Sequence, residues 1–307
     1  MRTLHTLQEL SSVSRPLVLA AGTFDGVHTG HASVIDRARR AAAAMNGETW
    51  VLTFDPHPLK ILHPASAPGL LTSTPHKVQL LAALSVDGCL VLPFTPELAR
   101  VEPEEFIDQL CDAAPSLKAI VIGANWTFGR KARGDVMLLR SLATAHGFDV
   151  HVASDATWKN EPVSSTRIRR AVSYGHFDEV EAMLGRSFSM LGTVVHGKKL
   201  GRELGFPTAN LDPHNEVHPP AGIYAVRARI GGSLHPAAAY LGGRRTEHQS
   251  GVVEVFIMDF AGDLYGRDIE IIFVKKLRDD HAFPDHAALA LQIGRDVEHA
   301  RQVLGAK

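Results

Sequence analysis

The sequence predicts an α/β first half with a mainly parallel sheet, followed by a small antiparallel β-barrel or sandwich with one helix. Two observations carry this prediction. The first half alternates short, continuously apolar runs with helical periods, whereas from about residue 190 apolar and polar residues alternate. At roughly 150 residues per domain, a chain of 307 residues favours two domains. We expect the boundary near Gly185 to Ser189, which gives domains 1–185 and 186–307.

The apolar runs of the first half are typical of strands that are buried on both faces of a sheet. Between the first two runs, Val34, Ala38, Ala42 and Met45 fall on one stripe of a helix. This βαβ alternation favours parallel strands with covering helices. The predicted strands are Leu17–Ala21, Thr49–Phe54, Cys89–Pro93, Ala119–Ile122 and Val150–Val152.

The second half has the period of two that half-buried strands show. Apolar residues take alternate positions in the runs Ile223–Ile230, Val253–Phe260 and Ile269–Phe273. Glycine pairs and an Ala-Gly-Asp turn separate these runs, and a helical stretch follows from about Asp285 to Leu304. Several short strands and one helix predict a small barrel or sandwich.

Composition narrows the range of functions. Lys plus Arg number 32 and Asp plus Glu number 33, so no net field attracts a polyanion and nucleic acid is not an expected partner. Two cysteines are too few for a disulfide framework, which favours a reducing compartment. The first residues lack the apolar core of a signal peptide, and no early apolar run is long enough for a membrane span. We therefore expect a soluble, cytoplasmic protein for which neither nucleic acid nor a membrane is a main partner.

The segment Gly22–His31 (GTFDGVHTGH) is the strongest chemical signal in the first half. Its three glycines lie where a strand passes into a helix, so a ligand can approach the backbone closely. The helix start offers free N–H groups and a positive dipole end, and His28 and His31 project the same way. These features predict a polyphosphate site, in which the imidazoles donate to charge that builds during transfer. The alternative is a tight turn with two solvent-exposed histidines.

Gly22–His31 resembles the phosphate-binding loop of the HxGH nucleotidyltransferases, and in particular that of the bacterial bifunctional riboflavin kinase/FAD synthetases. Further segments match that family in order along nearly the whole chain. They are Thr53–Pro58, Gly123–Gly129 with Gly134–Asp135, Ser164–Arg169 and Gly201–Asn210. The resemblance implies a Rossmann-like nucleotidyltransferase domain and a riboflavin kinase barrel. It also implies ATP as co-substrate, Mg²⁺, and FMN and FAD as products.

For the first half, the resemblance implies that His28 and His31 stabilise the transition state of FMN adenylylation. Ser164–Thr166 precede a helical stretch, so one hydroxyl there either simply caps that helix, or the hydroxyls of Ser165 and Thr166 reach phosphate if the helix start faces the loop. Arg169, one turn further along, would supply a cation for the leaving pyrophosphate. The nucleotide-binding residues implied in the loop itself are Gly22, Phe24, Asp25 and Gly30.

The same resemblance implies a flavin site in the first half. Phe54, Pro56 and Pro58 form a rigid apolar rim after a strand, for which a proline-stiffened loop is the alternative. Asn125 and Phe128 follow another strand, and ligands of open α/β sheets bind at such carboxyl ends. The family more commonly has Phe where this chain has Trp126, and since an aromatic side chain is kept we expect little change.

In the second half, Gly197, Lys198 and Gly201 form a basic, glycine-containing loop that would hold phosphate, unless it is a solvated turn. The resemblance implies that Thr208 and Asn210 bind Mg²⁺ and ATP phosphate through side-chain oxygens. It places the kinase general base at Glu254, a carboxylate beside the apolar Phe256.

Arg278 follows the last strand-like run and matches the flavin-side loop of the kinase family, where it would contact phosphate or flavin. The chain departs from the family in the stretch Tyr240–His248. Arg245 replaces an expected proline and Glu247 an expected aromatic residue, and loss of a residue with fixed φ loosens a loop.

That departure keeps an alternative open, namely an FAD synthetase whose second domain binds flavin without phosphorylating it. A second alternative is a non-catalytic flavin-binding protein. No Walker A string, GxGxxG fingerprint or serine nucleophile elbow competes with these interpretations. The sequence leaves the oligomeric state open.

Overall fold

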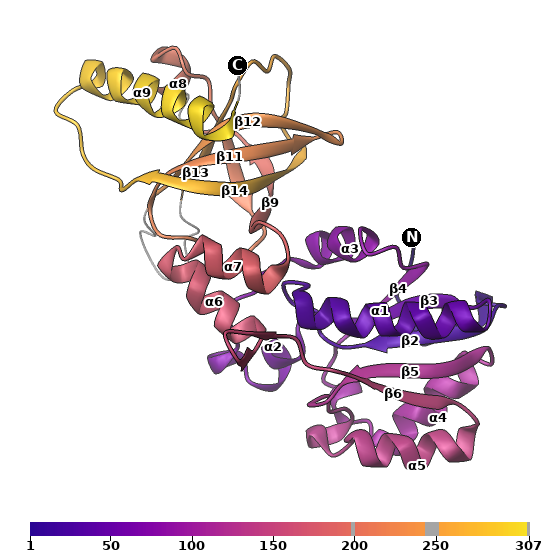
Figure 1. Cartoon of the computed structure of the whole chain (residues 1–307). Coiled ribbons are helices and arrows are strands. Elements are labelled where there is room, and N and C mark those ends of the chain that lie inside the picture. The colour runs from indigo at the N-terminus through magenta and orange to yellow at the C-terminus, as the bar shows by residue number, and fades with distance from the viewer. Residues whose placement is uncertain (198–199, 243–251, 306–307) are drawn as a thin grey trace. The chain divides into compact units, whose positions relative to one another are not determined.

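The computed structural model describes residues 1–197, 200–242 and 252–305, and it divides into two compact units (Figure 1). The first unit comprises Met1–Pro68 and Thr74–Ser164, and the second comprises Gly69–Ser73 and Ser165–Lys307. Each unit is described by itself.

The first unit contains a six-stranded sheet in the order β1-β4-β3-β2-β5-β6, in which every neighbouring pair is parallel. The five predicted strands are all present, so the predicted α/β class is confirmed. Sequence patterning missed β1 at the edge, because its residues are exposed or only partly buried and give no apolar signal. The strands are β1 (Arg2–Leu4), β2 (Leu17–Ala21), β3 (Glu48–Asp55), β4 (Gly88–Pro93), β5 (Leu117–Gly123) and β6 (Asp149–Ala153).

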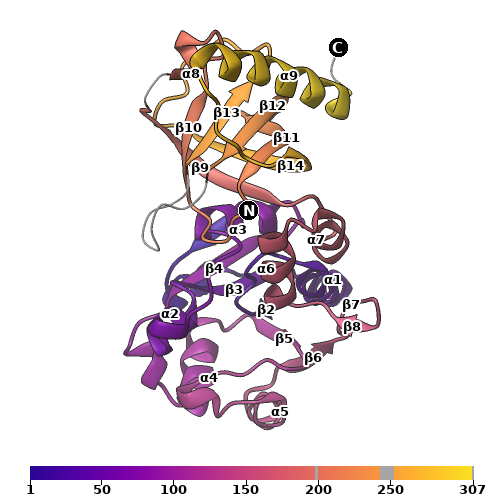
Figure 2. The same ribbon diagram turned by 90° about the vertical axis from the view of Figure 1, so that its left-hand side faces the viewer.

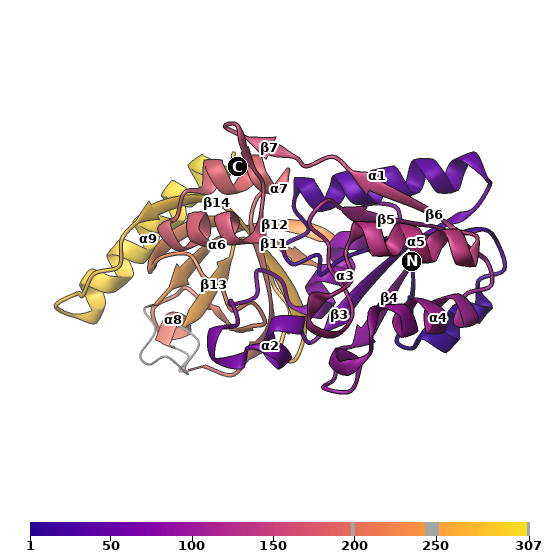
Figure 3. The ribbon, with the colours of Figure 1, turned by 90° about the horizontal axis from the view of Figure 1, so that it is seen from below.

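Helices cover both faces of this sheet (Figure 3). One face packs against α1 (Thr29–Ala44) and α3 (Thr74–Ala82). The other packs against a 3₁₀ helix at Leu7–Ser12 and against α4 (Pro103–Ala113) and α5 (Val136–His146). The remaining elements are α2 (Pro58–Leu62) and the hairpin strands β7 (Thr157–Trp158) and β8 (Glu161–Pro162).

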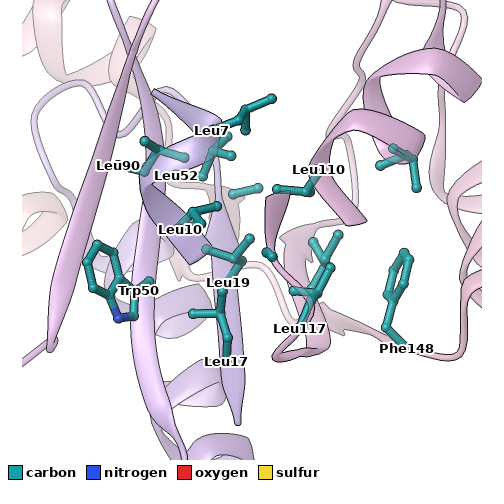
Figure 4. Packing of buried hydrophobic residues seen from close by; sticks show 14 of the residues in the cluster. Leu7, Leu10, Leu17, Leu19, Trp50, Leu52, Leu90, Leu110, Leu117 and Phe148 are labelled. Atoms are coloured by element: carbon teal, nitrogen blue, oxygen red, sulfur yellow. The ribbon is translucent and has the colours of Figure 1, made fainter. Parts of the chain in front are cut away.

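Alternate residues of the central strands serve two different cores. Leu17 and Leu19 of β2 join Trp50 in the cluster on the α4 side, which Figure 4 shows. Val18 and Ala20 point to the α1 side instead. Burial on both faces explains the apolar runs in these strands. Because β2 pairs in parallel with β3 and β5, the carboxyl ends of the three strands lie along one edge of the sheet.

The second unit contains a closed antiparallel barrel in the order β10-β13-β12-β11-β14-β9. Closure leaves no strand edge unpaired, so the barrel, not the sandwich, is the fold of the second half. The strands are β9 (Ser189–Val195), β10 (Ala209–Pro213), β11 (Gly222–Ile230), β12 (Ser233–Leu241), β13 (Val253–Ile257) and β14 (Asp268–Arg278), and a short helix α8 (Leu200–Glu203) precedes β10.

Helix α9 (His286–Leu304) lies across the outside of the barrel (Figure 2). It begins at Asp285, whose Oδ1 accepts a hydrogen bond from the Ala288 N–H at 2.8 Å and so satisfies an otherwise unpaired donor. Ala300 and Leu304 of α9 pack on Ala225 and Ala238 of the barrel. These alanines are therefore buried, although the period of two would place Ala225 on the outer face.

Helices α6 (Ser165–Tyr174) and α7 (Phe177–Leu184) also belong to the second unit. The ring of Phe177 stacks on Phe273 inside the barrel with centroids 5.8 Å apart, and meets Tyr224 edge-on. This aromatic contact joins α7 to the barrel.

A segment from the first half of the sequence, Gly69–Ser73, is part of the second unit. The Leu70 carbonyl accepts hydrogen bonds from the Glu216 and Val217 N–H groups at 3.0 and 3.1 Å. The buried Asn215 donates to the Leu71 carbonyl and accepts from the Leu191 N–H. The second unit therefore includes residues that sequence order alone assigns to the first. Throughout the described ranges, no helix combines the length and apolar character needed to cross a bilayer.

Candidate active sites

The loop between β2 and α1 holds a backbone conformation that L-residues rarely adopt. The φ angles of Phe24, Gly26 and Val27 are 52°, 81° and 42°. For a β-branched residue such as Val27 this region is strained, and strain of this kind costs about 1–3 kcal/mol. Strained backbone of this kind clusters at functional sites, and here it occurs where the sequence predicts a phosphate site.

The two histidines of the loop lie together, as the sequence predicts. His28 is the N-cap of α1, and its imidazole stacks on that of His31 with centroids 3.6 Å apart and an interplanar angle of 17°. Each Nδ1 accepts a hydrogen bond from the backbone N–H of the other residue at 3.3 Å. With Nδ1 used as the acceptor, the hydrogen of each neutral ring is on Nε2. Each of the two stacked rings thus carries one Nε2–H donor.

Glycine at position 30 leaves room for this stack. A Cβ there would lie 3.0 Å from His28 Cε1 and 3.1 Å from His28 Nδ1, tighter than nearly all real contacts. Phe24 is 1% exposed, and its ring contacts the His31 imidazole edge-on with the ring centroids 5.1 Å apart. This contact restricts the movement of the imidazole. Asp25 is buried in the same loop, and Gly22 donates to the Leu52 carbonyl at 3.1 Å. The predicted loop residues therefore form one folded turn.

A cavity of about 1050 Å³ lies in the first unit. Four of the predicted site residues line it, namely Phe54, Pro58, Asn125 and Phe128. Thr23 also lines it, so the cavity adjoins the segment Gly22–His31, which we call the histidine loop. A cavity of this size, largely apolar with a few polar groups, is typical of a site for a drug-sized or cofactor-sized ligand.

Aromatic rings form two walls of this cavity. Trp126 stacks on Phe128 with centroids 4.8 Å apart at 17°, and Phe54 meets Phe94 edge-on at 5.5 Å. Flat rings of this kind suit a planar heteroaromatic ligand, because offset and edge-on contacts add to the apolar burial.

Pro56 is not among the residues that line the cavity; it follows a cis peptide bond after Asp55. Sequence reasoning missed several residues that do line it. Arg100, Arg130 and Lys131 bring positive charge to the wall. Phe94 directly follows β4, and Phe54 is the residue before the last in β3. An aromatic residue near the carboxyl end of a parallel strand is a signal that could have found Phe94.

Ser165, Thr166 and Arg169 lie on α6, which belongs to the second unit, whereas the histidine loop belongs to the first. Ser165 and Thr166 are the first residues of the helix, and Thr166 is exposed. The Arg169 Nε donates to the Gly69 carbonyl at 2.7 Å, which attaches the Gly69–Ser73 segment to α6. The guanidinium of Arg169 is thereby held at a fixed point on the helix.

The barrel has its own cavity of about 330 Å³. Thr208, Asn210 and Glu254 all line it, as predicted for one site. Asn210 of β10 faces Glu254 of β13 in the strand register, and the Thr208 hydroxyl lies 3.5 Å from Glu254 Oε2. Adjacent strands therefore bring two neutral oxygen donors and one carboxylate together, a set that suits a hard cation and a proton acceptor.

Two predicted glycines pack against these residues. A Cβ on Gly197 would lie 2.2 Å from Asn210 Nδ2, and a Cβ on Gly201 would lie 2.5 Å from the Phe206 carbonyl oxygen and 3.0 Å from Thr208 Oγ1. Glycine at both positions lets the loop approach the Thr208 and Asn210 side chains closely.

Arg278 lines the barrel cavity with its guanidinium bound to Asp296. Its Nη2 donates to Asp296 Oδ2 at 2.7 Å and its Nε donates to Oδ1 at 2.9 Å. Its Nη1 donates to the Asp279 carbonyl and lies 3.0 Å from His281 Nδ1, and Phe283 packs beside it. Asp296 orients the arginine, and sequence reasoning missed it. The signal for it would have been a carboxylate among the apolar residues on the buried face of the helix that became α9.

Lys198 lies outside the described residues. So does the departure from the family pattern at Arg245 and Glu247, while Tyr240 at its start lies in β12 and donates its hydroxyl to Asp280 Oδ2 at 2.9 Å. In the part of the chain that the structure describes, no group of three or more His, Cys, Asp or Glu is arranged to hold a metal ion.

Comparison with known families assigns the two halves separately. Residues 10–167 match the family model for FAD synthetase, and residues 184–304 match that for riboflavin kinase.

Curated relatives match over nearly their whole length. One from Listeria monocytogenes is 34% identical over 300 residues, covering 96% of this chain and 94% of the relative. One from Escherichia coli K12 is 33% identical over 309 residues, covering 99% and 97%. Both are named bifunctional riboflavin kinase/FMN adenylyltransferase.

Among solved structures, a protein from Streptococcus pneumoniae described as a macrolide-efflux protein is 27% identical to this chain. It has a TM-score of 0.82 and covers 98% of this chain and 99% of its own. The same two-part architecture therefore exists in a crystal structure.

Proposed function

The chain belongs to the bifunctional riboflavin kinase/FMN adenylyltransferase family, and from this premise we propose how its two sites divide the chemistry. It is an enzyme with two activities. The kinase activity transfers the γ-phosphoryl group of ATP to riboflavin and gives FMN and ADP. The adenylyltransferase activity joins FMN to the AMP part of a second ATP and gives FAD and pyrophosphate.

One observation supports the division most: each unit contains a cavity lined by its own set of predicted site residues. The larger adjoins the histidine loop through Thr23, and the smaller contains Thr208, Asn210 and Glu254. We assign adenylyl transfer to the first and phosphoryl transfer to the second.

In adenylyl transfer an FMN phosphate oxygen attacks the α-phosphorus of ATP, and the bond to the β-phosphate oxygen breaks as pyrophosphate leaves. No protein nucleophile is required, so the protein's task is to position both substrates and stabilise charge. The Nε2–H groups of His28 and His31 donate to the oxygens that gain charge at the α-phosphorus.

The other first-half residues hold the substrates. The turn containing Gly22, Phe24, Asp25 and Gly30 receives the ATP phosphates at the start of α1, where the helix dipole favours anions. The family resemblance assigns pyrophosphate binding to Ser165, Thr166 and Arg169, which lie on α6 in the second unit. The flavin occupies the cavity lined by Phe54, Pro58, Asn125 and Phe128, and Pro56 shapes the turn at its rim.

In the kinase reaction Glu254 accepts the proton of the flavin ribityl hydroxyl as that oxygen attacks the γ-phosphorus. Its strand register opposite Asn210 and its position 3.5 Å from the Thr208 hydroxyl support this role. Gly197, Lys198 and Gly201 hold the ATP phosphates, and Arg278, oriented by Asp296, contacts the flavin side of the cavity.

The donor set of the barrel site fits Mg²⁺. Thr208 and Asn210 provide neutral oxygens, and a cation that keeps several waters needs few protein ligands when nucleotide phosphates complete its shell. Thr208 and Asn210 would hold the Mg²⁺ ion, which would supply positive charge to offset the charge of the nucleotide phosphates.

We propose that the functional domains are 1–185 and 186–307. The compact units divide at Ser164, because α6 and α7 pack with the barrel. Both cysteines are free thiols, which supports work in a reducing compartment such as the cytoplasm.

A product assay tests the assignment. Purified protein is given Mg·ATP with either riboflavin or FMN, and flavins, ADP and pyrophosphate are measured. We expect FMN and then FAD from riboflavin, and FAD from FMN. Formation of FAD from FMN alone would favour a single-activity FAD synthetase, and flavin binding without ADP or pyrophosphate release would exclude catalysis.

A further inference from the structure

A buried lysine joins the loop after β2 to Phe54 in one wall of the adenylyl-transfer site. Lys77 lies on α3, is 6% exposed, and places its ammonium at the carboxyl ends of β2 and β3. Its Nζ donates to the Thr23 carbonyl at 3.2 Å, to the Thr53 hydroxyl at 3.1 Å and to the Phe54 carbonyl at 3.2 Å. Three N–H donors thus meet three oxygen acceptors.

Two of those acceptors belong to residues that line the larger cavity. Thr23 is the residue at which the histidine loop leaves β2, and Phe54 forms part of the aromatic wall. The Thr53 hydroxyl donates in turn to the Thr23 carbonyl at 3.0 Å, which closes a small network. The ammonium therefore fixes the start of the histidine loop against the part of the aromatic wall that contains Phe54.

A buried cation is an expensive way to fill this space, because an apolar side chain of similar volume would avoid the cost of desolvation. Burial lowers the pKa of Lys77 below its ordinary value, while Asp25 of the loop, Cys89 of β4 and Asp55 of β3 act in the opposite direction. A neutral amine would have only two hydrogens for the three acceptors. The fit of donors to acceptors thus depends on the protonated form.

We propose that Lys77 is a positioning residue for adenylyl transfer, which holds the histidine loop and the flavin wall at the separation that brings the FMN phosphate to the α-phosphorus of ATP. All three of its donors are used within the protein, so it acts through Thr23 and Phe54 and not on the substrates. This inference rests on the adenylyl-transfer role proposed above for the loop.

Lys77→Met tests the proposal, since methionine keeps most of the volume and removes the charge and all three donors. A misplacement of about 1 Å can cost about 100-fold in rate, so we expect kcat for FAD formation from FMN to fall by about 10- to 100-fold. The KM values for FMN and ATP should change by less than about 3-fold, because the cavity lining is retained. The kinase reaction, which uses another unit, should be unchanged and is the internal control for folding.

Thr53 offers a matched pair if the Lys77 variant does not fold. Thr53→Val keeps the shape and removes one acceptor of the ammonium, whereas Thr53→Ser keeps the hydroxyl. We expect the valine variant to lower kcat for FAD formation by about 3- to 10-fold, a smaller displacement than loss of the whole network. The serine variant should remain close to wild type.

The dependence of the two activities on pH distinguishes a positioning role of Lys77 from a role in fold stability alone. As pH rises through the lowered pKa of Lys77, the ammonium loses a hydrogen and one acceptor loses its donor. The ratio of adenylyl transfer to riboflavin phosphorylation should therefore fall at alkaline pH in the wild type, and this fall should be absent in Lys77→Met.

Unchanged kcat in Lys77→Met, or equal loss of both activities, would overturn the proposal. Identical kcat values for the two Thr53 variants, or an alkaline fall that persists in Lys77→Met, would also overturn it. Failure of the proposed function is distinguishable, because the wild type would then form no FAD, or His28→Asn would still form it. If His28→Asn loses FAD formation while Lys77→Met keeps it, the positioning role alone is wrong.

Discussion

In the first unit, the groups assigned to ATP lie on a turn with positive φ angles and on the first turn of a helix, whereas in the barrel they lie on or beside hydrogen-bonded strands. His28 and His31 stack where Gly30 leaves space that a Cβ would crowd. Asn210 and Glu254 meet because β10 and β13 are neighbours in register.

The difference follows the chemistry of each reaction. Adenylyl transfer requires donors aimed at developing charge, and a helix start supplies backbone N–H groups and oriented imidazoles. Phosphorylation of a hydroxyl also requires a proton acceptor, and a strand in a closed barrel fixes a carboxylate with little freedom. If this comparison is right, each site can be disabled without the other.

The substitution that should separate the kinase activity from the adenylyltransferase activity most is Glu254→Gln. Glutamine keeps the size of the side chain but cannot accept the proton, so phosphorylation of riboflavin should fall by about 10²- to 10⁴-fold. FAD formation from FMN should stay within about 2-fold of wild type, because the variant leaves the first unit untouched. Initial rates with each flavin check this, and a kinase rate near wild type would exclude Glu254 as the base.

The converse separation should come from His28. His28→Asn keeps a side-chain oxygen that can accept from the His31 N–H, as the imidazole does at 3.3 Å, and so retains the helix cap. Loss of one donor to the transition state should lower FAD formation by about 10²- to 10³-fold. His28→Ala should lower it as much and also destabilise the unit, which thermal unfolding would detect. Substantial FAD formation by the asparagine variant would reject the role of the imidazole.

Gly197→Ala probes how closely the barrel loop approaches its site. The added Cβ would lie 2.2 Å from Asn210 Nδ2, so the amide must move. We expect the kinase rate to fall by about 10- to 100-fold, since small misplacements carry costs of this size. FAD formation from FMN is the control. Equal kinase rates in variant and wild type would show that Asn210 is not needed where it lies.

The smallest effect concerns stability, and it is confined to the unit that contains both cysteines. Burial raises the pKa of the Cys89 thiol to about 12 from 9.0. Because the folded protein binds the thiol proton more tightly than the unfolded chain, the protonated Cys89 thiol contributes to the free energy of unfolding. That contribution is fully present below pH 9 and is lost as the pH rises toward 12.

Urea unfolding of the wild type and Cys89→Ala at pH 8 and pH 10 checks this effect. The advantage of the wild type should shrink by up to about 1.4 kcal/mol per pH unit above pH 9. Cys111→Ala should show nearly the same pH dependence over this interval, because burial raises the pKa of that thiol to about 11, which also lies above pH 10. If the difference in the free energy of unfolding between the wild type and Cys89→Ala is the same at pH 8 and pH 10, the pKa of Cys89 is not raised by burial.

Much of the fold follows from periodicity in the sequence. The apolar runs of β2, β4 and β5 are buried because two cores cover the sheet. Strands β11, β13 and β14 show alternation because the barrel has one inner face. The edge strand β1 and the burial of Ala225 under α9 could not be predicted, because both depend on neighbours distant in sequence.

The sites show the same limit. Residues within a compact motif, such as His28 with His31, were predicted together, and the strand pairing of Asn210 with Glu254 agrees with their assignment to one site. Lys77 and Asp296 were missed because their importance arises from what they contact. Lysine on an ordinary helix and aspartate within α9 give no local signal, and only the fold brings them to Thr23 and Arg278.

The most direct test of two independent sites is complementation in a mixture. Glu254→Gln and His28→Asn are each given riboflavin and Mg·ATP, alone and together, and FAD is measured. We predict that Glu254→Gln alone leaves riboflavin unchanged, that His28→Asn alone stops at FMN, and that the mixture forms FAD from the released FMN. A mixture that forms no FAD, or a single variant that loses both activities, would contradict the account.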